Sequence, residues 1–320
     1  MNAAVVHSYD APPRYTTFAD PVASEGELLV NVIAAGLHPI VKSLANGTHY
    51  GSTGVLPFIP GLDGVGRQAS GALVYFGVFR APFGTFAELA PAVSKMSFPL
   101  PEGLDPVTAA GAANPGMSSW VALVHRAKLV KGENVLILGA TGSAGQLAVQ
   151  IAKHLGAARV VAAGRNPAVL DTLKDLGADA TISLGQDHAS LVASIRREWT
   201  GSGINVVLDY LWGQPAEAAL AALAQKGLQH SASRVRFVQI GEMAGKSIAL
   251  SGSTLRSSAI ELLGSGFGSA SMDQILSSLG DFFAFAAKSR LKINLKTVPL
   301  RDLEAVWNSP EKGARVVFIP

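Results

Sequence analysis

A glycine-rich turn at residues 139–145 (GATGSAG) carries the most specific chemistry in this sequence. It follows a short apolar run and precedes a segment with helical periodicity. Small side chains let the backbone approach a pyrophosphate, and the N-terminus of the next helix presents N–H groups and a positive dipole to that anion. We therefore expect a dinucleotide here, against the alternative of an ordinary strand–helix turn. The residues concerned are Ala140, which replaces the first glycine of the usual G-x-G-x-x-G pattern, Thr141, Gly142, Ser143, Ala144 and Gly145.

The residues after the second apolar strand distinguish the two nicotinamide cofactors. An acidic residue there would bind the ribose 2′-hydroxyl of NAD, whereas an arginine accommodates the 2′-phosphate of NADP. The chain has Gly164, Arg165 and Asn166 at this place and no acid. Arg165 can form charge-assisted hydrogen bonds to a phosphate. We therefore predict NADP(H), the alternative being that Arg165 is only a surface residue at a strand end.

Alternating strands and helices must position these groups. Apolar strands are expected at residues 134–138, 159–163, 180–184, 204–208 and 235–240, and helices at 145–155 and 167–176. A further helix should begin at Pro106, capped by Asp105. Apolar strands flanked by helices indicate a parallel sheet that is buried on both faces.

The two ends of the chain have a different pattern. Strands are expected at residues 27–34 and 83–90, with a Pro/Gly-rich connection at 57–66 between them. A last strand at 314–319 needs a partner, and we expect it to pair with the β-rich N-terminal part.

The composition excludes several classes of protein. The chain has 320 residues, which suits two packed domains, and no cysteine, so disulfides, thiolate chemistry and sulfur-ligated zinc are excluded. A net charge of +3 with scattered basic residues argues against nucleic acid. No apolar run reaches the ~20 residues that span a bilayer, and residues 1–10 do not form a signal peptide. We therefore expect a soluble, cytoplasmic protein without a membrane partner.

Three segments together resemble the medium-chain dehydrogenase/reductase superfamily, specifically its zinc-free quinone oxidoreductase branch. They are residues 59–66 (IPGLDGVG), 135–156 (VLILGATGSAGQLAVQIAKHLG) and 208–213 (LDYLWG). The resemblance implies an α/β fold with a Rossmann domain, a doubly wound parallel sheet, at residues 117–266. It also implies a GroES-like, mostly β substrate domain built from residues 1–116 and 267–320. NADPH as reductant and a homodimer formed through the Rossmann sheet edges are further implications.

The departures from this family concern the metal and the substrate side. Zinc-dependent relatives carry a Gly-His-Glu motif where this chain reads Gly61-Leu62-Asp63, so no catalytic zinc is expected. The usual Asn-Pro-Val-Asp segment begins here with His38, and its aspartate is lost. Tyr50 lies where the family often places an active-site tyrosine.

Hydride transfer without a metal favours substrates that are already activated, namely quinones and α,β-unsaturated carbonyls. Negative charge then develops on the substrate oxygen, which needs hydrogen-bond donors and a proton. The candidate donors are Tyr50, His38 and Asn114. Each has another possible role: Tyr50 at a loop rim, His38 in packing, and Asn114 as the cap of a following helix.

Further cofactor contacts are expected at the carboxyl ends of the later strands, where open α/β sheets bind their ligands. The residues there are Leu211, Trp212, Gly241, Gly264, Ser265 and Gly266. The sequence thus favours an NADPH-dependent, zinc-independent reductase of quinones or enones. An alcohol or aldehyde oxidoreductase and a non-catalytic NADPH-binding redox sensor remain as alternatives.

Overall fold

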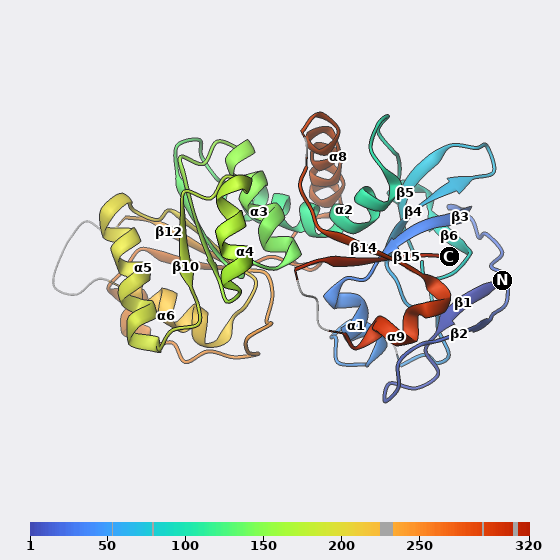
Figure 1. Ribbon diagram of the computed structural model, residues 1–320, viewed down its shortest axis with the longest axis horizontal. Helices are drawn as coiled ribbons and strands as arrows, with labels where there is room; N and C mark the ends of the chain where they lie inside the picture. The colour runs from blue at the N-terminus through green and yellow to red at the C-terminus, as the bar shows by residue number, and fades with distance from the viewer. Residues whose placement is uncertain (53, 79, 225–232, 290, 310–312) are drawn as a thin grey trace. The chain divides into compact units, whose positions relative to one another are not determined.

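The computed structural model describes residues 1–52, 54–78, 80–224, 233–289, 291–309 and 313–320. The chain forms two compact units: the first comprises Met1–Asn114 and Gly280–Pro320, and the second Pro115–Leu279. Each unit contains its own large sheet (Figure 1). A doubly wound parallel sheet in one unit and a mostly β fold in the other make this the expected α/β class. That the first unit binds the substrate and the second unit binds the cofactor stays a prediction.

The second unit is built on a six-stranded sheet in the order β10-β9-β8-β11-β12-β13, with all neighbours parallel. In chain order this arrangement is 3-2-1-4-5-6, the strand order of a Rossmann fold. The strands are β8 (Asn134–Leu138), β9 (Arg159–Gly164), β10 (Ala180–Ser183), β11 (Val206–Asp209), β12 (Val235–Gln239) and β13 (Ile260–Gly264).

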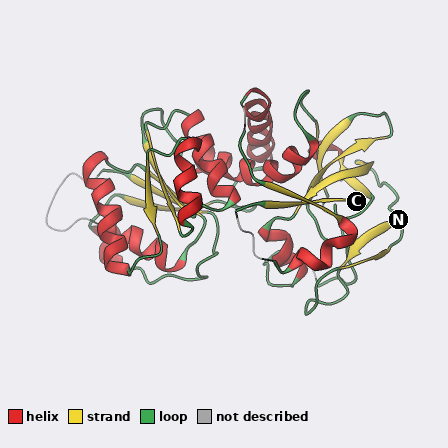
Figure 2. Ribbon diagram, viewed as in Figure 1, coloured by secondary structure: helices red, strands yellow, loops and turns green. Residues whose placement is uncertain are grey.

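Helices cover both faces of this sheet (Figure 2). Leu136 and Leu138 join a buried cluster with side chains of α5 and α6, and Val135 and Ile137, which alternate with them, are also fully buried. Two-sided burial explains why these strands are continuous apolar runs. The helices that lie wholly in this unit are η2 (Val121–Arg126), α3 (Ser143–His154), α4 (Pro167–Thr172), η3 (Leu173–Leu176), α5 (His188–Ser202), α6 (Gly213–Leu223) and α7 (Gly252–Arg256).

The first unit contains a seven-stranded sheet and a separate pair, β1 with β2. The larger sheet runs β14-β15-β3-β4-β5-β7, and β6 also pairs with β3. β15 pairs antiparallel with β3, so the prediction that the last strand joins the N-terminal part is confirmed. The strands are β1 (Asn2–Val5), β2 (Arg14–Thr17), β3 (Glu27–Gly36), β4 (Asp63–Gln68), β5 (Leu73–Gly77), β6 (Leu89–Val93), β7 (Ser97–Pro99), β14 (Leu295–Pro299) and β15 (Arg315–Ile319).

The remaining helices are short or extend across the division between the units. α2 begins at Pro106 as expected, and the Asp105 carboxylate accepts a hydrogen bond from the backbone N–H of Thr108 at 2.8 Å. The idea that Asn114 caps a following helix is wrong, because α2 continues through Asn114 and Pro115. These helices are α1 (Pro39–Ala45), η1 (Ser94–Met96), α2 (Pro106–Trp120), α8 (Met272–Lys288), η4 (Leu300–Asp302) and α9 (Leu303–Trp307).

Two predictions for the N-terminal part are wrong. The connection expected at residues 57–66 ends early, because β4 begins at Asp63 and pairs with both β3 and β5. Its glycines weaken a strand signal, but Gly64 is needed here since a Cβ atom would lie 2.8 Å from the carbonyl of Ala34. The strand expected at 83–90 is mostly a loop, and β6 starts only at Leu89. Phe86 of that loop is fully buried in the core, which explains why an apolar residue occurs there without a strand.

No helix among the described residues is both long and apolar enough to cross a membrane.

Candidate functional site

The glycine-rich turn lies between β8 and α3 in the second unit. Gly139 has φ +91°, and α3 begins at Ser143, two residues before the predicted start. The first intrahelical hydrogen bond runs from Gln146 N–H to the carbonyl of Gly142 at 2.9 Å. The N–H groups of residues 143–145 therefore lack intrahelical acceptors, as the first turn of a helix requires. They lie at the carboxyl end of β8, in the arrangement by which helix N-termini bind anions.

Close packing explains the small residues around this turn. A Cβ atom on Gly145 would lie 2.5 Å from Cα of Ala140, and one on Gly164 would overlap the side chain of Thr141. The Ser143 hydroxyl is buried and has no hydrogen-bond partner within the described part of the chain. A tightly packed glycine-rich turn with N–H groups free of intrahelical acceptors and an unpaired buried hydroxyl fits the phosphates of a dinucleotide.

The end of β9 presents Arg165 beside this turn. Gly164 is the last residue of β9, and Arg165 follows it as an exposed residue. Asn166 has a structural role, because its side-chain oxygen caps α4 by accepting a hydrogen bond from the backbone N–H of Val169 at 3.4 Å. Of these residues, the exposed Arg165 thus stays the candidate for the 2′-phosphate.

The end of β11 holds a residue that the sequence did not single out. Asp209 is fully buried, and its Oδ1 accepts hydrogen bonds from the backbone N–H groups of Leu211 (2.9 Å) and Trp212 (3.0 Å). Burial raises the pKa of Asp209 to about 6, although the two backbone hydrogen bonds act in the opposite direction. An aspartate directly after an apolar strand and two residues before an expected contact residue was the available signal.

The ends of β12 and β13 complete this edge of the sheet. Gly241 packs against the carbonyl of Tyr210, and Ser265 N–H donates to the carbonyl of Gln239 at 2.8 Å. Gly264 is the last residue of β13 rather than a residue after it. A hollow of ≈ 380 Å³ is lined by Trp212, Gln239, Glu242, Lys246, Leu262, Leu263 and Gly264.

All expected cofactor contacts therefore lie at one edge. In register, Leu138 is opposite both Ala163 and Asp209, and Gln239 is opposite both Asp209 and Gly264. Because the strands are parallel, the turns that follow them share the carboxyl edge of the sheet, which is where open α/β sheets bind ligands.

The donor candidates belong to the first unit. His38 is only 1% exposed; it precedes α1, and its Nε2 lies 3.4 Å from Oδ2 of Asp63. The same Asp63 oxygen accepts a hydrogen bond from the Tyr75 hydroxyl at 2.8 Å. Burial and the neighbouring Asp63 raise the pKa of Tyr75 well above its ordinary value. Sequence reasoning found His38 but not Asp63 on β4, which lies beside it, or Tyr75 on β5, which donates to Asp63.

Tyr50 and Asn114 have different surroundings from His38. Tyr50 is 82% exposed on the loop after α1, and its ring stacks on His49 with centroids 4.1 Å apart. Asn114 is half-buried within α2 and is the last residue of its segment of the first unit. Of the three candidates, His38 is thus the one that lies beside a buried carboxylate.

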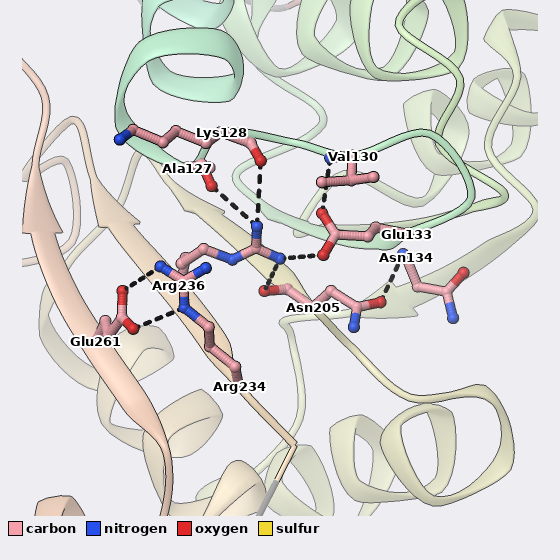
Figure 3. A network of polar contacts seen from close by, with 9 residues as sticks. All are labelled: Ala127, Lys128, Val130, Glu133, Asn134, Asn205, Arg234, Arg236 and Glu261. Atoms are coloured by element: carbon pink, nitrogen blue, oxygen red, sulfur yellow. Dashed lines mark hydrogen bonds and ion pairs between the residues drawn. The ribbon is translucent and has the colours of Figure 1, made fainter.

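The opposite, amino edge of the second unit's sheet carries a separate polar network (Figure 3). The Arg236 guanidinium, at the start of β12, donates to the carbonyls of Ala127 (2.9 Å) and Asn205 (3.2 Å) and forms an ion pair with Glu133 at 2.5 Å. Arg234 pairs with Glu261 beside it. This network joins the starts of β8, β11 and β12 and lies away from the expected cofactor contacts.

Comparisons with known proteins agree with this arrangement. A profile of the zinc-binding dehydrogenase family matches residues 144–281. A probable NADPH-dependent quinone reductase of Emericella nidulans is 29% identical over 362 aligned positions that cover the whole of both chains. The human quinone oxidoreductase is 28% identical over 71% of each chain. The chain belongs to the medium-chain dehydrogenase/reductase superfamily, in its quinone oxidoreductase branch.

Solved structures of this branch share the fold. The quinone oxidoreductase of Thermus thermophilus, also solved in complex with NADPH, is 26% identical to this chain, and the match covers all of both chains with a TM-score of 0.82. Although the matching profile is described as zinc-binding, no group of three or more His, Cys, Asp or Glu residues is arranged to hold a metal ion in the described residues.

Proposed function

We propose that this chain is an NADPH-dependent, zinc-independent reductase that transfers hydride to quinones or α,β-unsaturated carbonyls. The observation that carries the proposal is the turn at the carboxyl end of β8, where Gly145 and Gly164 pack too closely for side chains and three N–H groups are left for a phosphate. The full-length similarity to a probable NADPH-dependent quinone reductase supports the choice of cofactor and substrate class.

The cofactor, when bound, supplies the hydride. The residues of the second unit bind and orient it: the β8–α3 turn takes the pyrophosphate, and Arg165 takes the 2′-phosphate. The negative charge that develops on the substrate oxygen needs a donor from this chain. His38 is our first choice, because it lies beside the Asp63 carboxylate, which Tyr75 holds by a hydrogen bond. Tyr50 and Asn114 are the other candidates.

Zinc independence follows in this proposal from the residues at the family's metal position. Leu62 and Asp63 replace the histidine and glutamate of the Gly-His-Glu motif, and the chain has no cysteine. Asp63 accepts a hydrogen bond from Tyr75 and lies beside His38, so its carboxylate has partners other than a metal ion. Activity is expected to survive a strong chelator.

The test is NADPH oxidation with a panel of acceptors, measured before and after treatment with a chelator. Turnover with quinones or enones, and weak or no turnover with aldehydes, is the expected result. Aldehyde or alcohol turnover that depends on zinc would contradict the proposal. NADPH binding without turnover of any acceptor would favour a redox sensor.

A homodimer and a cytoplasmic location belong to the same proposal. β13 ends the strand order of its sheet, and among the described residues its outer edge has no strand partner. Leu262 on this strand and Phe267 after it are exposed apolar residues. An unpaired edge with exposed apolar side chains is a surface on which a second copy can extend the sheet. Light scattering on the purified protein would test the dimer.

A further inference from the structure

Asp209 is a buried carboxylate that the proposed chemistry does not use. Its two hydrogen bonds to the N–H groups of Leu211 and Trp212 close the turn that leads from β11 into α6. We propose that Asp209 is a positioning residue of the cofactor site, which acts by holding this turn and keeping Trp212 in a strained backbone conformation. The inference rests on the proposed binding of NADPH at this edge.

The backbone of Trp212 shows why the turn needs to be held. Its φ of +56° and ψ of −159° lie in a region that is essentially restricted to glycine. A residue with a side chain is strained in this region. Hydrogen bonds to a charged group are stronger than those between neutral groups, so the two bonds to Asp209 can offset the strain. Without the carboxylate, the backbone of Trp212 should relax.

The turn contacts two segments of the expected cofactor site. On one side, the Leu211 side chain lies so close to the phosphate turn that a Cβ atom on Gly139 would be 3.1 Å from it. On the other side, the Leu211 carbonyl accepts a hydrogen bond from Ala244 N–H at 2.7 Å, in the loop after β12. Trp212 itself lines the hollow at the ends of β12 and β13. A relaxed turn would therefore displace both walls of the site.

Burying a carboxylate costs free energy of folding, which indicates that Asp209 has a role beyond folding. Its Oδ2 is buried and has no hydrogen-bond partner in the ranges that the structure describes. A neutral side chain would avoid burying a charge, but it would accept hydrogen bonds from Leu211 and Trp212 less strongly. The carboxylate is thus best explained by the conformation that it imposes at Trp212.

A double-mutant cycle tests the inference, with the dissociation constant of NADPH measured by fluorescence titration. Asp209→Ala should raise this constant at least about tenfold, the effect of ~1.4 kcal/mol. In the Trp212→Gly background the same change should raise it less than about threefold, because glycine adopts the conformation unaided. An equal loss in both backgrounds, or no loss in the native background, would overturn the inference.

Asp179→Asn is the matched control for a general loss of stability. Asp179 lies at the amino edge of the same sheet, and its Oδ2 accepts a hydrogen bond from the backbone N–H of Val160 at 2.7 Å. This variant should lower Tm without changing the affinity for NADPH. A weakened affinity in the control would mean that the loss seen with Asp209→Ala is not specific.

If Asp209→Ala does not fold, the same cycle is run with Asp209→Asn, which keeps an acceptor oxygen. A loss of about threefold or more in the native background and less than about twofold in the Trp212→Gly background is expected, and equal losses overturn the inference. Native protein that fails to bind NADPH overturns the proposed function as well. Tight native binding that the Asp209 variants leave unchanged overturns this inference alone.

Discussion

The two edges of the Rossmann sheet bury charge in opposite ways. At the amino edge, the terminal nitrogens of Arg236 donate to backbone carbonyls and to the Glu133 carboxylate (Figure 3). At the carboxyl edge, the Ser143 hydroxyl and one oxygen of Asp209 are buried with no hydrogen-bond partner among the described residues. The buried charge at the amino edge is paired with a carboxylate, although Nε of Arg236 has no hydrogen-bond partner in the described part of the chain, whereas Asp209 at the carboxyl edge has no ion-pair partner there.

The largest expected effect is a loss of stability, without a change in cofactor affinity, from a substitution at the amino edge. Glu133→Ala leaves the Arg236 guanidinium buried without its counter-charge, and such a loss costs about 3–5 kcal/mol. We expect the lower end of this range, because the Glu133 side chain is 21% exposed. Urea unfolding measures the loss. Affinity for NADPH should be unchanged at a temperature where the variant is folded, and a weakened affinity would contradict the separation of the two edges.

The next largest expected effect is a loss of NADPH affinity, without loss of the fold, from a substitution at the carboxyl edge. Gly142→Val places a branched side chain at the N-cap of α3, where the phosphate should lie. The dissociation constant of NADPH should rise at least about 100-fold, or ~2.7 kcal/mol. The fold should survive, because φ is −78° and the nearest atom to a new Cβ is the Gly139 carbonyl oxygen at 3.5 Å. Unchanged affinity by titration would mean that this turn does not bind the cofactor.

Asp209→Asn tests the buried carboxylate of the carboxyl edge through the pH dependence of stability. The folded-state pKa of Asp209 is raised from 3.8 to about 6. The contribution of Asp209 to the free energy of unfolding is therefore fully present below pH 3.8 and is lost as pH rises through about 6. The variant has no carboxylate to titrate at this position. Its free energy of unfolding, relative to that of the native protein, should therefore rise by about 2 kcal/mol between pH 4 and pH 8. Urea unfolding at both pH values measures it, with Asp179→Asn as the control. Parallel pH profiles for native and variant would contradict the prediction.

The smallest effect separates the two nicotinamide cofactors. Arg165→Ala removes an exposed side chain at the end of β9, and we expect about a tenfold loss of NADPH affinity, ~1.4 kcal/mol. NADH has no 2′-phosphate, so its affinity should change little. Titration of both nucleotides against native and variant protein measures the ratio. An equal change for both would show that Arg165 does not select the phosphate.

Local patterns were sufficient for the first two strands of the Rossmann unit. The strands at residues 134–138 and 159–163 were predicted to within one residue, because two-sided burial makes each a continuous apolar run. The cap at Asp105 was likewise readable, since a cap and its N–H partner lie three residues apart. The family resemblance rests on similar short segments and is confirmed by the comparisons.

Local sequence patterns were thus enough to predict the parallel sheet, the glycine-rich turn and an arginine at the end of β9. The folded chain was needed to show that residues 63–68 form a strand, that His38 lies beside Asp63, and that Asp209 is buried next to a strained Trp212. The reason is physical. Helix periodicity and caps depend on residues three or four positions apart, but the pairing of β4 and the surroundings of His38 depend on segments tens of residues away. Whether a charge is buried is set by what packs around it, and the sequence near that charge does not contain those neighbours.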